Sequence, residues 1–298
     1  MLKNTRKQID GWLVIDKPLT MGSTNVVSKI KWSLSPTKIG HAGTLDPLAS
    51  GVLPIALGRA TKLIPFVMDG TKIYDFQITW GAETETDDKE GPIIQTSEKR
   101  PTEEDVRAIL PKFIGMIEQV PPAYSALKID GKRAYDLARA GSKVNLKARI
   151  IEIKELHLLR FDEVSADFRV ICGKGTYVRS LGRDIGRKLG CLGYISALRR
   201  IACGPFKIEQ TTDIHTFDDK KENVTVLPID IALTQMPKLD CSAEVAMRLK
   251  QGQRLKLKDI MPSIPLHDAS IIRILSEGNL IGLARIQSGI IHPYRMFV

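Results

Sequence analysis

A single carboxylate lies in a glycine-rich stretch near the start of the chain. Residues 40–51 read Gly-His-Ala-Gly-Thr-Leu-Asp-Pro-Leu-Ala-Ser-Gly, with Asp46 as their only acid. A carboxylate held in such a loop can act as a nucleophile or as a base. An aspartate followed by proline is also a common helix start, because aspartate caps free N–H groups and proline fits the first helical position. Asp46-Pro47 alone therefore leaves both interpretations open.

Three arginines recur at helical spacing later in the chain. Residues 177–189 predict a helix, because apolar residues recur on one face and Gly190 follows as a stop signal. Arg179, Arg183 and Arg187 stand at i, i+4 and i+8 and form a basic stripe. Such a stripe is also typical of a solvated helix face, so spacing alone leaves the role of Arg179 open.

Residues 73–80 alternate between apolar and polar types, which predicts a half-buried strand. Tyr74 lies on its apolar side together with Phe76, Ile78 and Trp80. An aromatic ring in this position can stack on a nucleic-acid base. Ordinary core packing explains the same pattern, so both interpretations of Tyr74 stay open.

The segment from about 124 to 149 is rich in lysine and arginine and carries two glycines. We expect it to be an excursion from the core, and contacts from its basic side chains to phosphates of a polyanion would raise affinity without reading sequence. A solvated charged loop is the alternative. The basic residues of this segment are Lys128, Lys132, Arg133, Arg139, Lys143, Lys147 and Arg149.

The composition narrows the class of protein. The 298 residues include 44 Lys and Arg against 34 Asp and Glu, a formal net charge of +10, which favours a polyanionic partner. The four cysteines are widely spaced without a Cys-x-x-Cys, so we expect buried reduced thiols and no structural zinc site. Because neither a signal-like segment nor an apolar run of membrane-spanning length is present, we expect a cytoplasmic protein.

The remaining patterns predict an α+β chain. Ser23 is expected to cap a helix, and Thr102 with Asp105 forms a capping-box pattern before a second helix that Pro111 shortens or kinks. Residues 84–90 are acidic and polar, which predicts a loop. Further strands are expected over residues 11–17, 150–161 and 167–172.

The character of the chain changes near Pro237, and we place a domain boundary near Gln235. Beyond it, a helix is expected over residues 242–251, and short strands over 271–275, 280–287 and 290–297.

Taken in order, these stretches resemble the TruB family, the tRNA pseudouridine-55 synthases. Residues 40–49 match every fixed position of its signature Gly-His-x-Gly-x-Leu-Asp-Pro-Leu-Ala. One departure occurs at residues 20–24, where Thr-Met-Gly-Ser-Thr stands in place of the usual Gly-x-x-Ser. Five further family motifs are resembled by residues 11–18, 69–74, 124–128, 174–181 and 198–200.

The resemblance implies a fold and a reaction. The expected fold is α+β, with a pseudouridine synthase-type catalytic domain over residues 1–235 built on a mixed or antiparallel central sheet. It also implies a basic RNA-gripping insertion at about 124–149 and a small β-rich, PUA-like RNA-binding domain over 236–298. The implied reaction is the isomerisation of uridine to pseudouridine at position 55, in the T-loop of tRNA, on a base flipped out of the RNA.

The resemblance also assigns roles to residues. Asp46 is the expected nucleophile, attacking C1′ or C6 or acting as a base, and Arg179 is its charge partner, which keeps a carboxylate ionised where burial would neutralise it. The expected contacts to the flipped base come from His41, Tyr74, Tyr177 and Leu198, and those to RNA phosphates from Lys128, Lys132 and Arg133.

No metal or cofactor is expected, because the isomerisation oxidises nothing and no phosphate-loop or dinucleotide motif is present. The expected partner is the T-arm of tRNA, with no membrane, no obligatory protein partner and a monomeric state. Two alternatives stay open: a non-catalytic RNA-binding or tRNA-folding protein, and a guide-RNA-dependent pseudouridylase. The presence of Asp46 and Arg179 disfavours the first, and the lack of long basic tails disfavours the second.

Overall fold

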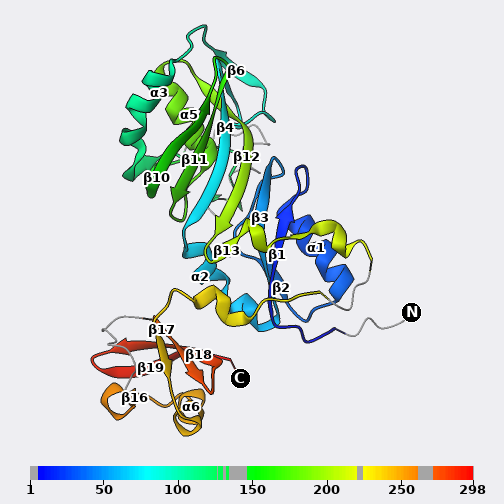
Figure 1. Cartoon of the computed structure of the whole chain (residues 1–298), viewed down its shortest axis with the longest axis vertical. Coiled ribbons are helices and arrows are strands. Elements are labelled where there is room, and N and C mark those ends of the chain that lie inside the picture. Colours follow the sequence, from blue (N-terminus) through cyan, green and yellow to red (C-terminus); the bar gives the residue numbers. More distant parts are fainter. Residues whose placement is uncertain are drawn as a thin grey trace.

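One long mixed sheet organises most of the chain (Figure 1). The computed structural model describes residues 6–125, 127–129, 132–133, 146–219, 224–260 and 271–297. Within these ranges the strands follow the order β14-β1-β3-β12-β4-β11-β10-β7, and β2 and β13 pair with β3 and β12. The pairs β1–β14 and β3–β12 are parallel and the others are antiparallel, so the expectation of a mixed central sheet is confirmed.

The strands of this sheet have the following bounds. They are β1 Gly11–Lys17, β2 Ile39–His41, β3 Ala49–Leu57, β4 Lys72–Trp80, β7 Gly115–Gln119, β10 Arg149–Phe161, β11 Ser165–Cys172, β12 Gly193–Cys203, β13 Phe206–Lys207 and β14 Thr212–Asp213. The predicted strands over 11–17, 73–80, 150–161 and 167–172 are therefore confirmed. In β4 the apolar side is buried at Phe76, Ile78 and Trp80, while Tyr74 is only half-buried.

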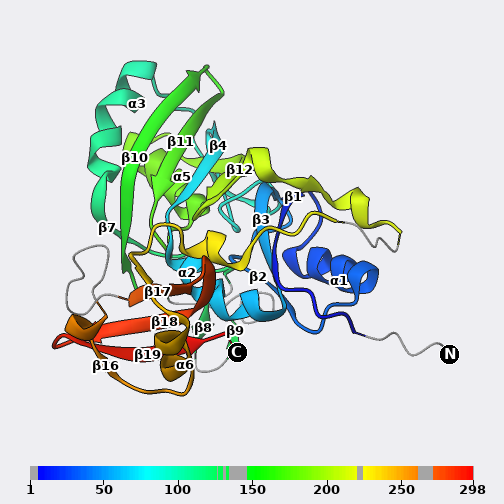
Figure 2. The same cartoon turned by 60° about the horizontal axis from the view of Figure 1, so that its bottom comes forward.

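The helices α3 (Glu103–Ile109) and α5 (Val178–Leu189) pack together beside one end of the sheet, and α1 (Ser23–Leu34) covers the other end (Figures 1 and 2). The helix α5 packs on β12, and α3 packs on α5. Gly190 ends α5 with a φ of +70°, and the capping box of Thr102 and Asp105 is formed, both as predicted. Pro111 lies in a 3-10 turn directly after α3, which confirms that the helix is short.

One local prediction is wrong. The helix α1 (Ser23–Leu34) forms, but its N-cap is Gly22, without a side-chain cap. Ser23 lies inside the first turn, where its hydroxyl bonds the backbone of Leu45 instead. A tertiary contact has thus replaced the local capping bond that the sequence favours.

The C-terminal residues form a second, five-stranded sheet of order β15-β17-β18-β19-β16, and the β-rich C-terminal part is confirmed. It packs against the base of the main sheet through a shared apolar cluster that includes Trp12, Phe206, Leu283 and Phe297. The division into domains at residue 235 stays a prediction. The elements are β15 Lys238–Asp240, α6 Ala243–Lys250, β16 Leu255–Lys256, β17 Ile271–Ser276, β18 Asn279–Gln287 and β19 Ile290–Met296.

Small elements complete the fold. The short helix α2 (Ile64–Asp69) leads into β4, and β5 (Ala82–Thr84) pairs with β6 (Ile93–Thr96) in a hairpin. Within the basic segment, β8 (Lys128–Ile129) pairs with β9 (Lys132–Arg133). The side chains of Lys128, Lys132 and Arg133, and most of residues 126–145, lie outside the described part of the chain.

Candidate active site

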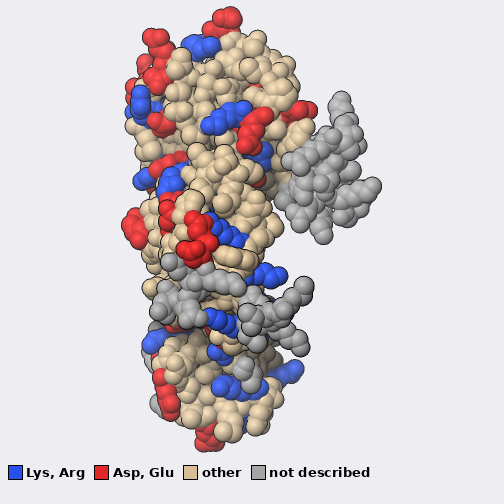
Figure 3. Space-filling model, turned by 90° about the vertical axis from the view of Figure 1, so that its right-hand side faces the viewer, with Lys and Arg blue, Asp and Glu red and all other residues tan. Residues whose placement is uncertain are grey.

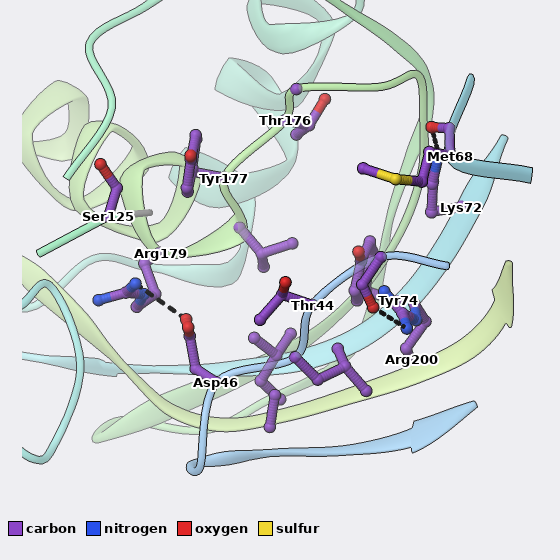
Figure 4. A pocket seen from close by; sticks show the side chains of 16 residues that line it. Thr44, Asp46, Met68, Lys72, Tyr74, Ser125, Thr176, Tyr177, Arg179 and Arg200 are labelled. Atoms are coloured by element: carbon purple, nitrogen blue, oxygen red, sulfur yellow. Dashed lines mark hydrogen bonds and ion pairs between the residues drawn. The ribbon is translucent and has the colours of Figure 1, made fainter. Parts of the chain in front are cut away.

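Asp46 lies in the loop between β2 and β3, at the edge of a pocket (Figure 4). The helix start that Asp46-Pro47 could signal does not form. Pro47 and Leu48 make a tight turn, closed by a bond from the Ala49 N–H to the Asp46 carbonyl (3.0 Å), and β3 begins at Ala49. The Asp46 side chain keeps 45% of its surface exposed, so its carboxylate is accessible from the pocket.

Two features hold the loop. The Ser23 hydroxyl accepts a hydrogen bond from the Leu45 N–H and donates one to the Leu45 carbonyl, each at 2.8 Å. Just after the loop, at the start of β3, Gly51 has a φ of +99°, and a Cβ built there would lie 2.2 Å from the Arg200 carbonyl oxygen. Only glycine fits this position, because any side chain would push β3 away from β12.

Arg179, in the first turn of α5, faces Asp46 directly. Its Nη2 lies 2.8 Å from the Asp46 Oδ2 (Figure 4). Its Nη1 lies 3.3 Å from the Asp88 Oδ2 and donates to the Thr86 carbonyl, and Nη2 also donates to the Tyr124 carbonyl (2.9 Å). The Arg179 side chain is only 7% exposed, so it is a buried cation held between two carboxylates and not part of a solvated face.

The other two arginines of the stripe are paired in the same way. Arg183 bonds Asp87 at 2.8 Å, and Arg187 bonds Glu83 at 2.7 Å. The predicted loop over residues 84–90 does form, but Asp87 and Asp88 are buried in it. Burial disfavours the ionised form and raises the pKa of Asp87 to about 6, although the guanidinium of Arg183 opposes the shift. Residues 83–88 are thus an acidic strap that each arginine of α5 holds.

Tyr74 and Arg200 form the opposite wall of the pocket (Figure 4). They are direct partners in the β4–β12 ladder, and the Tyr74 hydroxyl accepts a hydrogen bond from Arg200. Arg200 is 1% exposed and also donates to the carbonyls of Val52 (2.7 Å) and Gly43 (2.9 Å). Burial raises the pKa of Tyr74 to about 12, so the phenol is neutral in the free protein.

Most of the predicted site residues come together. Asp46, Tyr74, Tyr177, Arg179 and Leu198 all line the pocket, although they are spread over more than half of the chain. Leu198 reaches it because β12 pairs in parallel with β3, which sets Leu198 opposite Ala49. Burial raises the pKa of the Tyr177 phenol.

His41 does not line the pocket. It ends β2, and its Nδ1 is buried without a hydrogen-bond partner among the described residues. Burial and the nearby Arg200 lower the pKa of His41, so the imidazole is neutral at pH 7. His41 therefore lies apart from the pocket that Asp46 and Arg179 line.

Comparison with known proteins gives the family. Residues 31–178 match the TruB family pseudouridylate synthase N-terminal domain, 179–234 match the tRNA pseudouridylate synthase B C-terminal domain, and 237–297 match the pseudouridine synthase II TruB C-terminal model. The chain is 46% identical over 302 residues to a tRNA pseudouridine synthase B of Sinorhizobium medicae, covering 98% of this chain and 96% of the relative. It is 48% identical over 305 residues to one of Agrobacterium fabrum, covering 98% and 95%.

The chain belongs to the TruB family of pseudouridine synthases. A solved structure, the crystal structure of a Cbf5-Nop10-Gar1 complex, has a chain that matches this TruB-family enzyme with a TM-score of 0.76 at 24% identity. The match covers 97% of this chain and 85% of that one, and it confirms the pseudouridine synthase fold.

Sequence reasoning assigned no role to several residues in or near this TruB-family pocket. Lys72, Ser125 and Arg200 line it. Asp88 bonds Arg179, and the charge of Asp46 acts on the nearby Lys17. Lys17 is fully buried, and its ammonium group donates hydrogen bonds to the carbonyl oxygens of Pro18 (2.8 Å) and Met21 (2.6 Å). Burial lowers its pKa to about 8, and the charge of Asp46 opposes that shift. Lys72 bonds carbonyls at the end of α2, Met68 among them, and lies on the strand of Tyr74.

Among the described residues, no three His, Cys, Asp or Glu side chains lie close enough together to hold a metal ion. No helix in the same part of the chain has the length and apolar character needed to cross a bilayer.

Proposed function

We propose that this enzyme isomerises uridine 55 in the T-loop of tRNA to pseudouridine, with Asp46 as the nucleophile. The Asp46–Arg179 ion pair carries the proposal, because it presents an accessible carboxylate beside a buried guanidinium at the mouth of a pocket. Relatives that are 46–48% identical over nearly the whole chain are named tRNA pseudouridine synthase B, which supports tRNA as the substrate.

The reaction fits the groups present. The N1–C1′ bond of the nucleoside breaks, the uracil rotates, and C5 bonds to C1′ while C5 loses a proton and N1 gains one. Asp46 could attack C1′ or C6 or take a proton from the ribose, and each role needs an ionised carboxylate. Arg179 stabilises that charge from 2.8 Å, and Asp88 holds Arg179 in place.

The flipped base would enter the pocket between the two walls. Tyr74 offers its ring for stacking, and Leu198 and Tyr177 bound the space. Because Asp46 is 45% exposed in the free protein, we infer that the bound RNA closes the pocket and excludes water from the reaction.

Recognition of RNA is supported by charge. The chain has a formal net charge of +10. On the face drawn in Figure 3, Lys and Arg side chains lie over the C-terminal sheet, in the lower part of the view. We further propose that Lys128, Lys132 and Arg133 contact phosphates, that the T-arm suffices for binding, and that the enzyme acts as a cytoplasmic monomer without an obligatory protein partner.

The test uses purified protein alone with unmodified tRNA transcript, followed by mapping of pseudouridine. We expect the product at position 55 only. Product that forms only with added guide RNA or protein would contradict the stand-alone function, and product at another uridine would contradict the assigned position.

The Asp46→Asn variant tests the chemistry. It keeps the size of the side chain but removes its charge, so release of tritium from C5-labelled uridine should fall to background while filter binding of tRNA persists. Near-normal tritium release would refute the assignment of Asp46. Loss of binding and folding together would favour a purely structural role.

A further inference from the structure

Gln119 makes an unusual pair of contacts at the end of β7. Its side-chain amide is buried, with the residue 2% exposed. Its Nε2 donates to the Tyr177 carbonyl (3.1 Å), and its Oε1 accepts from the Tyr177 N–H (2.9 Å). One side chain therefore bonds both backbone groups of a single residue that is 58 positions away in sequence.

Tyr177 is the residue directly before α5, and its backbone sets the direction of the first turn. Its carbonyl also accepts the first helical bond, from the Leu181 N–H at 3.1 Å. Arg179 follows two residues later. A shift of the Tyr177 peptide groups would carry the Arg179 guanidinium away from Asp46, to which it is bonded at 2.8 Å.

The same segment is tied to α5 at two more points. The Val120 carbonyl accepts from Arg183 (2.9 Å), and the Tyr124 carbonyl accepts from Arg179 itself (2.9 Å). Residues 119–125 thus run along the start of α5 and then lead into the basic segment. Of these three ties, the Gln119 amide is the one closest to the start of the helix, and it holds the Tyr177 backbone, whereas the Ser125 hydroxyl interacts only with the Tyr177 phenol.

We propose that Gln119 is a positioning residue that fixes the first turn of α5, and with it the geometry of the Arg179–Asp46 pair. The proposal rests on the proposed function, since it concerns the rate of that reaction. Gln119 does not line the pocket of Asp46, so its removal should slow the chemical step and leave tRNA binding intact.

The experiment compares two variants with a neighbour. Gln119→Met keeps the length of the side chain and removes both bonds, whereas Gln119→Glu keeps the acceptor and removes the donor. Glu118→Gln, one residue earlier on the exposed side of β7, is the matched control. Single-turnover rate, tRNA affinity and thermal melting are measured for each.

We expect the Met variant to react at least about tenfold more slowly, because small misplacements of catalytic groups cost that much or more. Its dissociation constant for tRNA should stay within about twofold of wild type, and the control should match wild type. Folded variants that react at the wild-type rate would overturn the proposal. A loss of affinity with an unchanged rate would also overturn it.

A second readout separates positioning from general stability. In the Gln119→Glu variant, an ionised carboxylate repels the Tyr177 carbonyl, whereas the neutral acid can donate to it, and burial favours the neutral acid. The rate of this variant, divided by that of wild type, should therefore rise as the pH is lowered and the carboxyl group takes up a proton. A Gln119→Glu variant that reacts as fast as wild type at every pH would contradict the role of the donated bond.

Charged groups near this position set the pKa of the introduced carboxyl group, and the arginines among them oppose the effect of burial by favouring its ionised form. Arg149 is paired with Gln119 across β10, and Arg179 and Arg183 bond the same segment. The hollow beside Gln119 is also lined by Lys112, Glu118, Asp184, Arg187 and Lys188.

Failure of this proposal and failure of the proposed function give different results. If wild-type protein forms no pseudouridine in tRNA, the function is wrong. If wild-type protein is active and the folded Gln119 variants are equally active, only the role of Gln119 is wrong.

Discussion

Ser23 and Leu45 are joined by two hydrogen bonds through one hydroxyl. The Ser23 Oγ donates to the Leu45 carbonyl and accepts from its N–H, each at 2.8 Å, and both residues are buried. Asp46 is the residue after Leu45. The two bonds therefore attach the backbone beside the Asp46 carboxylate to the first turn of α1, where Ser23 lies. The Gln119 side chain likewise bonds both the N–H and the carbonyl of Tyr177, which lies two residues before Arg179. Each half of the Asp46–Arg179 pair is therefore set by one polar side chain from a distant segment.

The first prediction concerns Ser23→Ala. It leaves two buried backbone groups of Leu45 without partners, which should cost about 1–3 kcal/mol of stability. The freed loop should also slow pseudouridine formation about tenfold or more. Urea unfolding and a single-turnover assay check both effects. Ser28→Ala, on the exposed face of α1, should change stability by less than about 0.5 kcal/mol. Equal behaviour of the two variants would contradict the role of Ser23.

The second prediction concerns Asp88→Asn. Arg179 would keep its bond to Asp46 but lose its second carboxylate, which is 3% exposed and lies 3.3 Å away. We expect the rate to fall at least about tenfold, because a buried guanidinium with one anion is less fixed, and stability to fall by about 1–3 kcal/mol. Glu85→Gln, exposed in the same loop, serves as the control. If tRNA affinity fell while the rate held, Asp88 would not act through Arg179.

Periodic patterns predicted the elements that carry the site. The alternation around Tyr74 marked β4, and the apolar stripe with Gly190 marked α5, because each reports which face is buried. The order of motifs, together with the family resemblance, pointed to Asp46 and Arg179 as partners, and the structure places them in contact.

The acidic strap could not be predicted from local patterns. Composition marks residues 84–90 as a polar loop, and polar loops are normally solvated. Asp87 and Asp88 are buried only because arginines almost one hundred residues later pair with them. The acids of residues 83–88 and the arginines of α5 do pair with one another. Their spacing could have predicted this only if the two segments had been known to lie side by side.

Arg200 was missed for a similar reason. An arginine beside a second arginine in a strand suggests exposure, since arginine is seldom fully buried. Its burial depends on the register of β12 between β3 and β4, which sets Arg200 against Gly51 on one side and Tyr74 on the other. Register across a mixed sheet is a property of the whole fold and cannot be derived from one strand.

The third prediction concerns Lys17 and pH. Its pKa is about 8 in the folded protein, against 10.5 for an unperturbed lysine. Between these values the unfolded chain holds a proton that the folded chain has released, so this residue makes the free energy of unfolding rise with pH, by up to about 1.4 kcal/mol per unit. Its destabilising effect is complete below about pH 8 and is relieved above it.

Urea unfolding of wild type and Lys17→Met at several pH values tests this. The stability of wild type minus that of the variant should increase from about pH 8 to about pH 10, because methionine has no such proton. A constant difference would show that Lys17 has an ordinary pKa. Below pH 8 the two curves should run parallel.

The fourth prediction concerns the basic segment. Replacing Lys128, Lys132 and Arg133 together by Ala should weaken tRNA affinity and flatten its salt dependence by roughly 0.9 in log–log slope for each lost duplex-phosphate contact. Filter binding over a range of salt concentrations measures this slope. An unchanged slope would mean that these residues do not contact phosphates, whatever happens to the affinity at a single salt concentration.

The last prediction separates stacking from packing at Tyr74. Tyr74→Phe keeps the ring but loses the hydrogen bond from Arg200, whereas Tyr74→Leu loses the ring as well. If the ring stacks on the flipped uracil, the Leu variant should lose about 1–3 kcal/mol of stabilisation of the bound base, and the Phe variant should retain it. Single-turnover rates at saturating tRNA and melting curves for both variants decide the matter. Since Tyr74 is only half-buried on β4, a Leu side chain should be tolerated by the fold. A Leu variant that reacts as fast as wild type would make Tyr74 a residue of the core, and the base would then need another platform in the pocket, with Tyr177 the remaining aromatic side chain that lines it among the described residues.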